Sequence, residues 1–144
     1  MRRVPKLSVY IHPADIPYVF KSNPGMSELK SRIIPTQDQF MLTLGNSTML
    51  RFIHMPGHTE GSQSILVNGT RLFTGDTLMV GCTGRLDLPG GNLKEMKKTL
   101  RERLGNLEDG TVVYPGHKYG GEWTTIGIER EKGVIGRFTR RKRS

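Results

Sequence analysis

The sequence contains a single cysteine, Cys82, so no internal disulfide can form and a disulfide-built secreted scaffold is excluded. No apolar run approaches the ~20 residues that a membrane-spanning helix needs, so we expect no membrane segment. The first six residues carry basic side chains without an apolar stretch behind them, which argues against a signal peptide. These absences together predict a cytoplasmic protein.

Acidic residues are absent from the last eight positions, and this absence accounts for much of the net charge of +9. Residues 137–144 carry five positive charges, and without them the rest of the chain stands near +4. We interpret residues 137–144 as a solvated basic tail that follows one domain over residues 1–136, because 144 residues support a single domain. A nuclear-localisation signal and a nucleic-acid contact are the alternatives, although the tail has no Tyr or Trp for base stacking.

Short apolar runs separated by glycine predict a sheet. The runs at 40–44 and 49–53, and at 64–67 and 71–74, flank turn residues, and Asn68-Gly69 is a strong hairpin signal. Asn92 can cap a helix over 93–104 that ends at Gly105. Its apolar stripe would comprise Leu93, Met96, Leu100 and Leu104.

The weaker signals complete the expected order of elements. A strand over 7–11 precedes a helical turn over 13–20, and Ser27 can cap a short helix that Pro35 stops. A β-branched strand over 111–114 precedes a last helix capped by Thr124 or Thr125. Hairpins followed by strand, helix, strand and helix predict an α/β (α+β) fold in which a sheet packs against helices.

Three residues of metal-binding type directly follow a glycine at the ends of predicted strands. They are His58, Asp76 and His117, and the tripeptide Pro-Gly-His occurs twice among only four histidines. Glycine permits the sharp turns that such positions need. Imidazole and carboxylate groups together suit zinc or iron. We therefore predict that these three residues bind metal.

Three further residues receive other interpretations. We interpret His54 as structural, because Pro56 and Gly57 break the strand that would align it with His58. His12 beside Pro13 is interpreted as a turn residue, and Cys82 as a small residue of a glycine-rich loop at 78–91.

The motifs around these residues resemble those of the metallo-β-lactamase superfamily. Residues 54–62 resemble its H-x-P-G-H-T-x-G-S motif, and residues 72–78 its L-F-x-G-D-T-L segment. Residues 84–91 resemble the G-R-x-D loop of the glyoxalase II-like (hydroxyacylglutathione hydrolase-like) branch. Residues 115–117 match the last metal motif, and residues 124–130 the short final helix of single-domain members. Four ordered motifs are a far more specific signal than one.

The resemblance implies an αββα sandwich with a metal centre at one edge of the sheets. In that family two metal ions share a bridging aspartate, which Asp76 matches, while His58 matches a ligand of the first metal and His117 a ligand of the second. Zinc is the implied cofactor, with iron or manganese as alternatives. The implied reaction is hydrolysis of a thioester, a glutathione thioester in the glyoxalase II-like branch.

One family motif is absent. The string H-x-H-x-D-H occurs nowhere, and residues 7–20 resemble the strand and helix that come directly after it in the family. We therefore expect an incomplete domain that lacks roughly the N-terminal third of the sandwich, most simply through a truncated reading frame. We also expect an exposed apolar sheet face and weak metal binding by this chain alone. Pairing with a second copy or with a complementing chain is the alternative to a truncated product.

The sequence supports three hypotheses for function. The first is a metal-dependent thioester hydrolase, impaired by the missing motif. The second is a non-catalytic remnant that binds a partner through its exposed sheet. The third is a nucleic-acid-processing relative, suggested by the basic tail. For the G-R-x-D loop, we expect Arg85 and Asp87 to brace each other rather than to contact a substrate.

Overall fold

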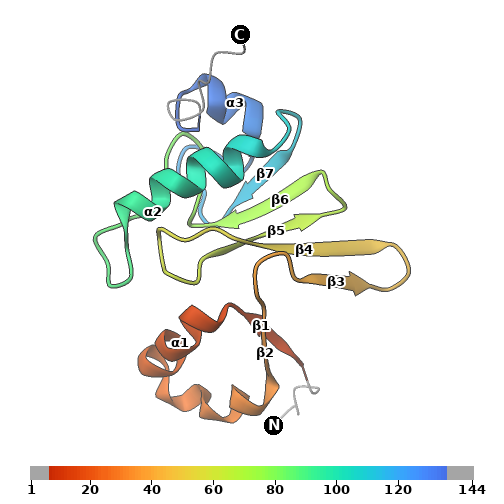
Figure 1. Cartoon of the computed structure of the whole chain (residues 1–144), viewed down its shortest axis with the longest axis vertical. Helices are drawn as coiled ribbons and strands as arrows, with labels where there is room; N and C mark the ends of the chain where they lie inside the picture. Colours follow the sequence, from red (N-terminus) through yellow and green to blue (C-terminus); the bar gives the residue numbers. More distant parts are fainter. Residues whose placement is uncertain (1–6, 136–144) are drawn as a thin grey trace.

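The hairpins expected between residues 40 and 75 form four of the strands, from one edge inward, of a six-stranded sheet in the computed structural model, which describes residues 7–135 (Figure 1). The strands are β3 (Met41–Leu44), β4 (Thr48–His54), β5 (Gln63–Val67), β6 (Arg71–Gly75), β7 (Val112–Pro115) and β8 (Thr124–Thr125). They lie side by side in chain order, and all neighbours are antiparallel except β6 and β7. The α/β fold expected from the sequence is confirmed.

Turn chemistry explains why the two hairpins close where they do. Asn68 and Gly69 both have positive φ, at 47° and 73°, as a two-residue turn of type I′ requires. The turn between β3 and β4 contains Gly45 at φ 59°. Both turns were predicted from the sequence.

Helices cover one face of this sheet and enclose the core. Helix α2 (Leu93–Lys98) continues through a π-helical turn, η3 (Thr99–Arg103), and a 3₁₀ turn, η4 (Leu104–Asn106), and a short α3 (Ile126–Glu131) follows β8. The main hydrophobic cluster between the helices and the sheet comprises Ile53, Met55, Leu66, Leu72, Leu78, Met96, Leu100, Leu104, Val113, Ile126 and Ile135.

The long helix agrees with its sequence signals except for one residue of the expected buried stripe and the position of its C-terminal end. The Asn92 side chain accepts a hydrogen bond from the Glu95 amide, and Thr125 caps α3 in the same way through Ile128. Leu93 is wrong as a member of the buried stripe, because it lies in the first turn and remains exposed. Gly105 was expected to end the helix, but it lies inside the 3₁₀ turn, so the helical segment ends at Asn106.

The second face of the sheet carries a row of apolar side chains. Phe52 pairs with Ile65, Ile65 with Phe73, and Phe73 with Tyr114, so these four residues point to the same side. The rings of Phe73 and Tyr114 stack 5.1 Å apart, and Phe73 is 47% exposed. The expectation of an exposed apolar face is therefore confirmed for part of this row.

The N-terminal segment forms a small unit beside the large sheet. Strand β1 (Val9–Ile11) pairs in parallel with β2 (Ile33–Pro35), and between them lie η1 (Pro13–Asp15), α1 (Ile16–Ser22) and η2 (Pro24–Arg32). Tyr10 of β1 packs 6.0 Å from both Phe40 and Phe52, at one end of the apolar face. The prediction that Ser27 caps a helix is wrong, because the 3₁₀ segment already begins at Pro24, which suits a first helical turn.

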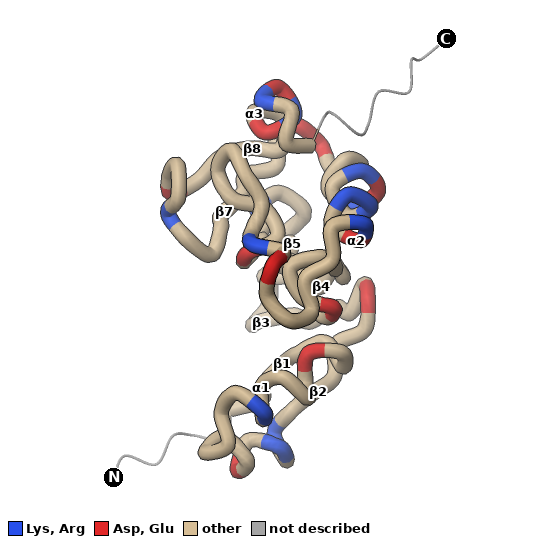
Figure 2. Tube along the Cα trace, turned by 90° about the vertical axis from the view of Figure 1, so that its left-hand side faces the viewer, with Lys and Arg blue, Asp and Glu red and all other residues tan. Residues whose placement is uncertain are grey.

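Charge is distributed unevenly along the chain. All 13 acidic residues lie between residues 7 and 135, whereas five of the 22 basic residues fall in the predicted tail at 137–144, outside the described residues. Figure 2 shows that basic residues predominate along α2, whose six residues include three lysines and one glutamate. Within residues 7–135, no helix has the length and apolar character needed to cross a membrane.

Candidate metal centre

Sheet direction brings the three predicted ligand residues to one edge. Strand β4 is antiparallel to β5 and β5 to β6, so β4 and β6 run the same way, and β7 runs parallel to β6. The carboxyl ends of β4, β6 and β7 therefore meet at the same edge of the sheet. His58 follows β4 by four residues, while Asp76 and His117 follow the ends of β6 and β7 almost directly.

The three side chains meet around the carboxylate of Asp76. Nε2 of His58 lies 3.3 Å from Oδ2, and Nε2 of His117 lies 3.3 Å from Oδ1. Each histidine thus faces a different oxygen of the same aspartate. Asp76 is 28% exposed and His117 is 51% exposed, so the cluster opens to solvent on the His117 side.

Glycine makes this close arrangement possible. Gly75 turns the chain at φ 53°, directly before Asp76. Gly116 donates its amide to the Gly75 carbonyl at 2.8 Å, and a Cβ at Gly116 would lie 2.7 Å from Oδ1 of Asp76. Only glycine therefore lets the β7 end lie this close to the carboxylate.

A backbone carbonyl orients His58. Its Nδ1 lies 2.7 Å from the carbonyl oxygen of Arg85, which leaves Nε2 directed at Asp76. Such a hydrogen bond on the far nitrogen is how metal-binding histidines are usually oriented. The G-R-x-D loop therefore acts on the cluster through its main chain.

The loop after β7 stacks one aromatic ring on His117. The rings of His117 and Tyr119 stack 5.1 Å apart, and Lys118 pairs with Glu122 across the turn at 2.6 Å. Trp123 ends this loop, directly before β8, and is 58% exposed.

Arg85 and Asp87 brace each other, as predicted from the sequence. Nε and Nη2 of Arg85 each donate to one oxygen of Asp87 at 2.9 Å. The Arg85 guanidinium lowers the pKa of Asp87 to about 2. Both side chains are 68% exposed, so the pair shapes the loop but contributes little stability.

Replacing Arg85 with alanine should raise the pKa of Asp87 from about 2 toward the ordinary value of about 3.9, because both hydrogen bonds from the guanidinium are lost. The backbone hydrogen bond to the Asp87 carboxylate remains and keeps the pKa below that value. Since the pKa is depressed in the folded chain, any stability from the pair is present above about pH 4 and is lost as the pH falls toward 2. Carboxyl-selective NMR titration measures the shift. Arg101→Ala is the control, and an unchanged Asp87 pKa in Arg85→Ala would contradict the bracing role.

Two of these side chains at a time are spaced to bind one metal ion, but the three together do not form a complete three-ligand site. Two ligand atoms bound to one four-coordinate zinc ion lie about 3.4 Å apart, close to both 3.3 Å separations. A catalytic zinc uses three protein ligands, however, and within residues 7–135 no group of three His, Cys, Asp or Glu side chains could hold one ion. The described residues therefore offer one histidine and one carboxylate oxygen on each side of Asp76.

The remaining histidines and Cys82 lie outside this cluster. His12 accepts a hydrogen bond from the Ala14 amide as the first residue of a turn, and its ring stacks on His54 at 4.1 Å. Nε2 of His54 lies 2.7 Å from the Glu60 carbonyl oxygen, so both structural interpretations are confirmed. Cys82 is exposed and free.

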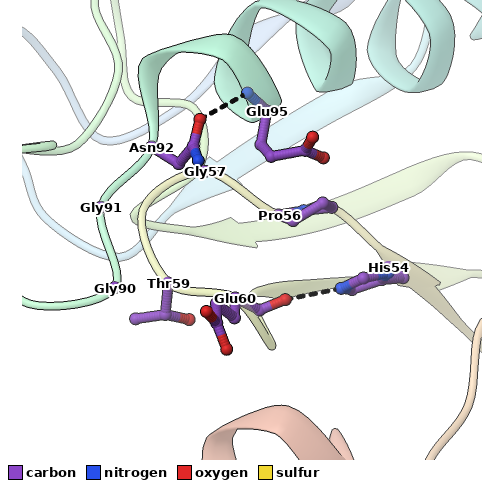
Figure 3. Close-up of a pocket in the computed structure, with 9 residues that line it drawn as sticks. All are labelled: His54, Pro56, Gly57, Thr59, Glu60, Gly90, Gly91, Asn92 and Glu95. Atoms are coloured by element: carbon purple, nitrogen blue, oxygen red, sulfur yellow. Dashed lines mark hydrogen bonds between the residues drawn. The ribbon is translucent and has the colours of Figure 1, made fainter.

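A cavity of about 480 Å³ lies beside the His58 loop, between the end of β4 and the start of α2 (Figure 3). Its carboxylates are Glu60 and Glu95, and its remaining lining residues are His54, Pro56, Gly57, Thr59, Gly90, Gly91 and Asn92. Both neighbours of His58 in the chain line this cavity, so it adjoins the candidate site.

The comparison with known families agrees with this geometry. The family model described as the metallo-beta-lactamase superfamily matches residues 2–117, which contain all three clustered residues. The chain belongs to the metallo-beta-lactamase superfamily.

Two superfamily relatives bear names of enzymes. The hydroxyacylglutathione hydrolase GloC of Haemophilus influenzae is 37% identical over 79 residues, covering 54% of this chain and 36% of GloC. Human mitochondrial persulfide dioxygenase ETHE1 is 30% identical over 124 residues, covering 81% of this chain and 48% of ETHE1.

A solved superfamily structure shares the fold. The crystal structure of TTHA1623 in a di-iron-bound form is 30% identical and superposes with a TM-score of 0.68, covering 93% of this chain and 64% of that one. The chain spans 61% of a 34% identical relative from Mycobacterium tuberculosis and 48% of human ETHE1, so it covers about half to three fifths of these longer proteins. The superfamily fold expected from the motifs is thus confirmed, as is the partial length.

Proposed function

We propose that the chain contributes the metal-binding half of a hydrolase active site of the glyoxalase II-like kind, with a thioester as substrate. The supporting observation is the cluster in which His58 and His117 each face one oxygen of Asp76 at 3.3 Å. The 37% identity to GloC, a hydroxyacylglutathione hydrolase, supports the thioester and favours a glutathione thioester.

In this proposal His58 and His117 would hold metal through their ring nitrogens, and Asp76 would contribute its carboxylate. Arg85 fixes the His58 ring through its carbonyl, and Gly116 leaves room for the Asp76 carboxylate. A divalent ion held there would lower the pKa of a coordinated water toward neutrality, which supplies the nucleophile for attack on a carbonyl. Zinc is our first choice of metal, and iron or manganese are alternatives.

The identity of 30% to human ETHE1 over 81% of this chain favours a second candidate, a persulfide dioxygenase. That activity requires a redox metal, so the metal distinguishes the two proposals. The zinc-loaded chain should release thiol from a glutathione thioester, whereas a dioxygenase loaded with Fe²⁺ should consume oxygen in the presence of an organic persulfide.

Because each side of Asp76 has a single histidine within residues 7–135, we further propose that the active form completes its ligand set from a second copy or a complementing chain. Nucleic acid is a less favoured partner, and it would bind through the basic tail.

Native mass spectrometry of the purified chain, with zinc and then with a chelator, tests the metal proposal and reports the assembly state at the same time. We expect one or two chelator-sensitive zinc ions per chain or per dimer, followed by chelator-sensitive thioester turnover. A species that stays metal-free at saturating zinc would contradict metal binding by this chain. Because turnover needs the completed ligand set, a dimer that takes up zinc without thioester turnover would contradict the choice of substrate.

A further inference from the structure

The loop that carries His58 is held by a residue more than 40 positions earlier in the chain. Asp15, at the end of η1, reaches across from the N-terminal unit with both carboxylate oxygens. Its Oδ2 accepts a hydrogen bond from the Thr59 hydroxyl at 2.7 Å, and its Oδ1 accepts one from the Gly61 amide at 2.8 Å. Asp15 therefore binds the residue next to His58 and the one three positions after it.

The loop is shaped to receive this carboxylate. A Cβ at Gly61 would lie 2.5 Å from Cγ of Asp15, although the backbone of Gly61 itself does not require glycine. The Thr59 hydroxyl also contacts Oγ of Ser62 at 2.8 Å, and that oxygen accepts the Thr59 amide at 2.9 Å. Gly57 in turn donates to the Thr59 carbonyl. The hydrogen bonds of Asp15 are thus connected, through Thr59, to residues on both sides of His58 in the chain.

A second contact joins the same two segments. The His12 ring stacks on His54 with an interplanar angle of 8°, and His54 contacts the Glu60 carbonyl. Burial, and then the neighbouring His54, lower the pKa of His12, which favours the uncharged ring and therefore favours stacking without charge repulsion. Residues 12 and 15 therefore hold the loop at both of its ends.

We propose that Asp15 is a positioning residue for His58, acting through Thr59 and Gly61, so that the N-terminal unit controls the geometry of the candidate site. This inference rests on the proposed role of His58 as a metal ligand. Both oxygens of Asp15 are used in bonds to the loop, which leaves Asp15 to act through hydrogen-bond geometry rather than by contact with a metal or a substrate.

The geometry predicts different results for two substitutions at the same position. Asp15→Asn keeps an acceptor for the Gly61 amide, and its amide group can donate to the Thr59 hydroxyl, which can still donate to Ser62. Asp15→Ala loses both bonds. Zinc affinity should therefore fall between about 10- and 100-fold in Asp15→Ala, the range for losing a residue that orients a ligand, and remain within about threefold of wild type in Asp15→Asn.

Local hydrogen exchange provides a readout that does not require metal. The amides of residues 57–61 should exchange at least tenfold faster in Asp15→Ala than in wild type, with rates near wild type in Asp15→Asn. Thr59→Val, which removes only the hydroxyl, should give an intermediate rate and keeps the inference testable if Asp15→Ala does not fold. If wild type binds no zinc, the proposed function fails, while the exchange rates still decide the role of Asp15.

Asp38→Ala is the matched control. Like Asp15, Asp38 accepts hydrogen bonds from a backbone amide and from side chains, but it bonds none of residues 57–61. Its donors are the His54 amide at 2.9 Å, Arg103 at 2.7 Å and Gln39 at 3.2 Å. The Asp38→Ala variant should unfold at a lower urea concentration than wild type. Its zinc affinity and the amide hydrogen exchange of residues 57–61 should remain near wild type. Equal losses in Asp38→Ala and Asp15→Ala, or equal losses in Asp15→Asn and Asp15→Ala, would overturn the inference.

Discussion

Asp76→Asn should abolish chelator-sensitive thioester turnover and weaken zinc binding more than any other single substitution. Both histidines of the cluster face Asp76, so its carboxylate serves both halves of the candidate site. Asparagine keeps the shape but offers a single neutral oxygen, so one histidine loses its partner and the negative charge is lost. The affinity loss should exceed the about 10–100-fold that removal of an orienting residue costs.

The measurement is zinc affinity by chelator competition, together with thiol release from a glutathione thioester. Asp109→Asn is the control, because Asp109 is a surface carboxylate paired with Arg130, away from the cluster. It should change neither quantity by more than about twofold. Asp76→Asn with wild-type zinc affinity would show that the carboxylate is not a ligand.

Gly84→Ala should cause a large loss of stability for the addition of one methyl group, and it should act on the residue that carries the same carboxylate. Gly84 is buried and donates its amide to the Asp76 carbonyl at 2.8 Å. A Cβ at this position would overlap that carbonyl oxygen and approach Cβ of Asp76 to 3.0 Å. Because the obstacle is backbone, no rotamer change relieves it, and we expect a loss of about 2–3 kcal/mol in the free energy of unfolding.

Urea unfolding followed by circular dichroism measures this loss. Gly110→Ala is the matched control, because a Cβ there meets nothing within 4 Å and its φ is not positive. It should leave stability unchanged or raise it by up to about 1 kcal/mol. Should Gly84→Ala unfold at the wild-type midpoint, the close packing of the G-R-x-D loop against Asp76 would be wrong.

The sequence predicted the elements whose signals are local. Asn68-Gly69 determined its hairpin because few other residues adopt two successive positive φ values. Asn92 determined the start of α2 because its side chain is an N-cap acceptor. The residues of the candidate site could also be predicted from the sequence, because they directly follow predicted strands. Strand direction then brings the residues that follow β4, β6 and β7 to one edge of the sheet.

Other features depend on contacts between distant segments and could not be predicted from one sequence. Asp15 lies in an ordinary turn, and only the folded chain places it against Thr59 and Gly61. Leu93 fits the apolar stripe by spacing, but in the folded chain its side chain, in the first turn of α2, remains exposed. The Arg85 carbonyl that orients His58 is a main-chain group with no sequence signature.

The position of Trp123 gives the protein a built-in optical probe. It is the only tryptophan in the sequence, and it ends the loop that begins with His117. With more than half of its surface in solvent, its emission will be red-shifted and open to collisional quenching by iodide or acrylamide. A metal ion, a substrate or a partner that orders this loop will change the emission maximum and the quenching constant, with no label and no substitution.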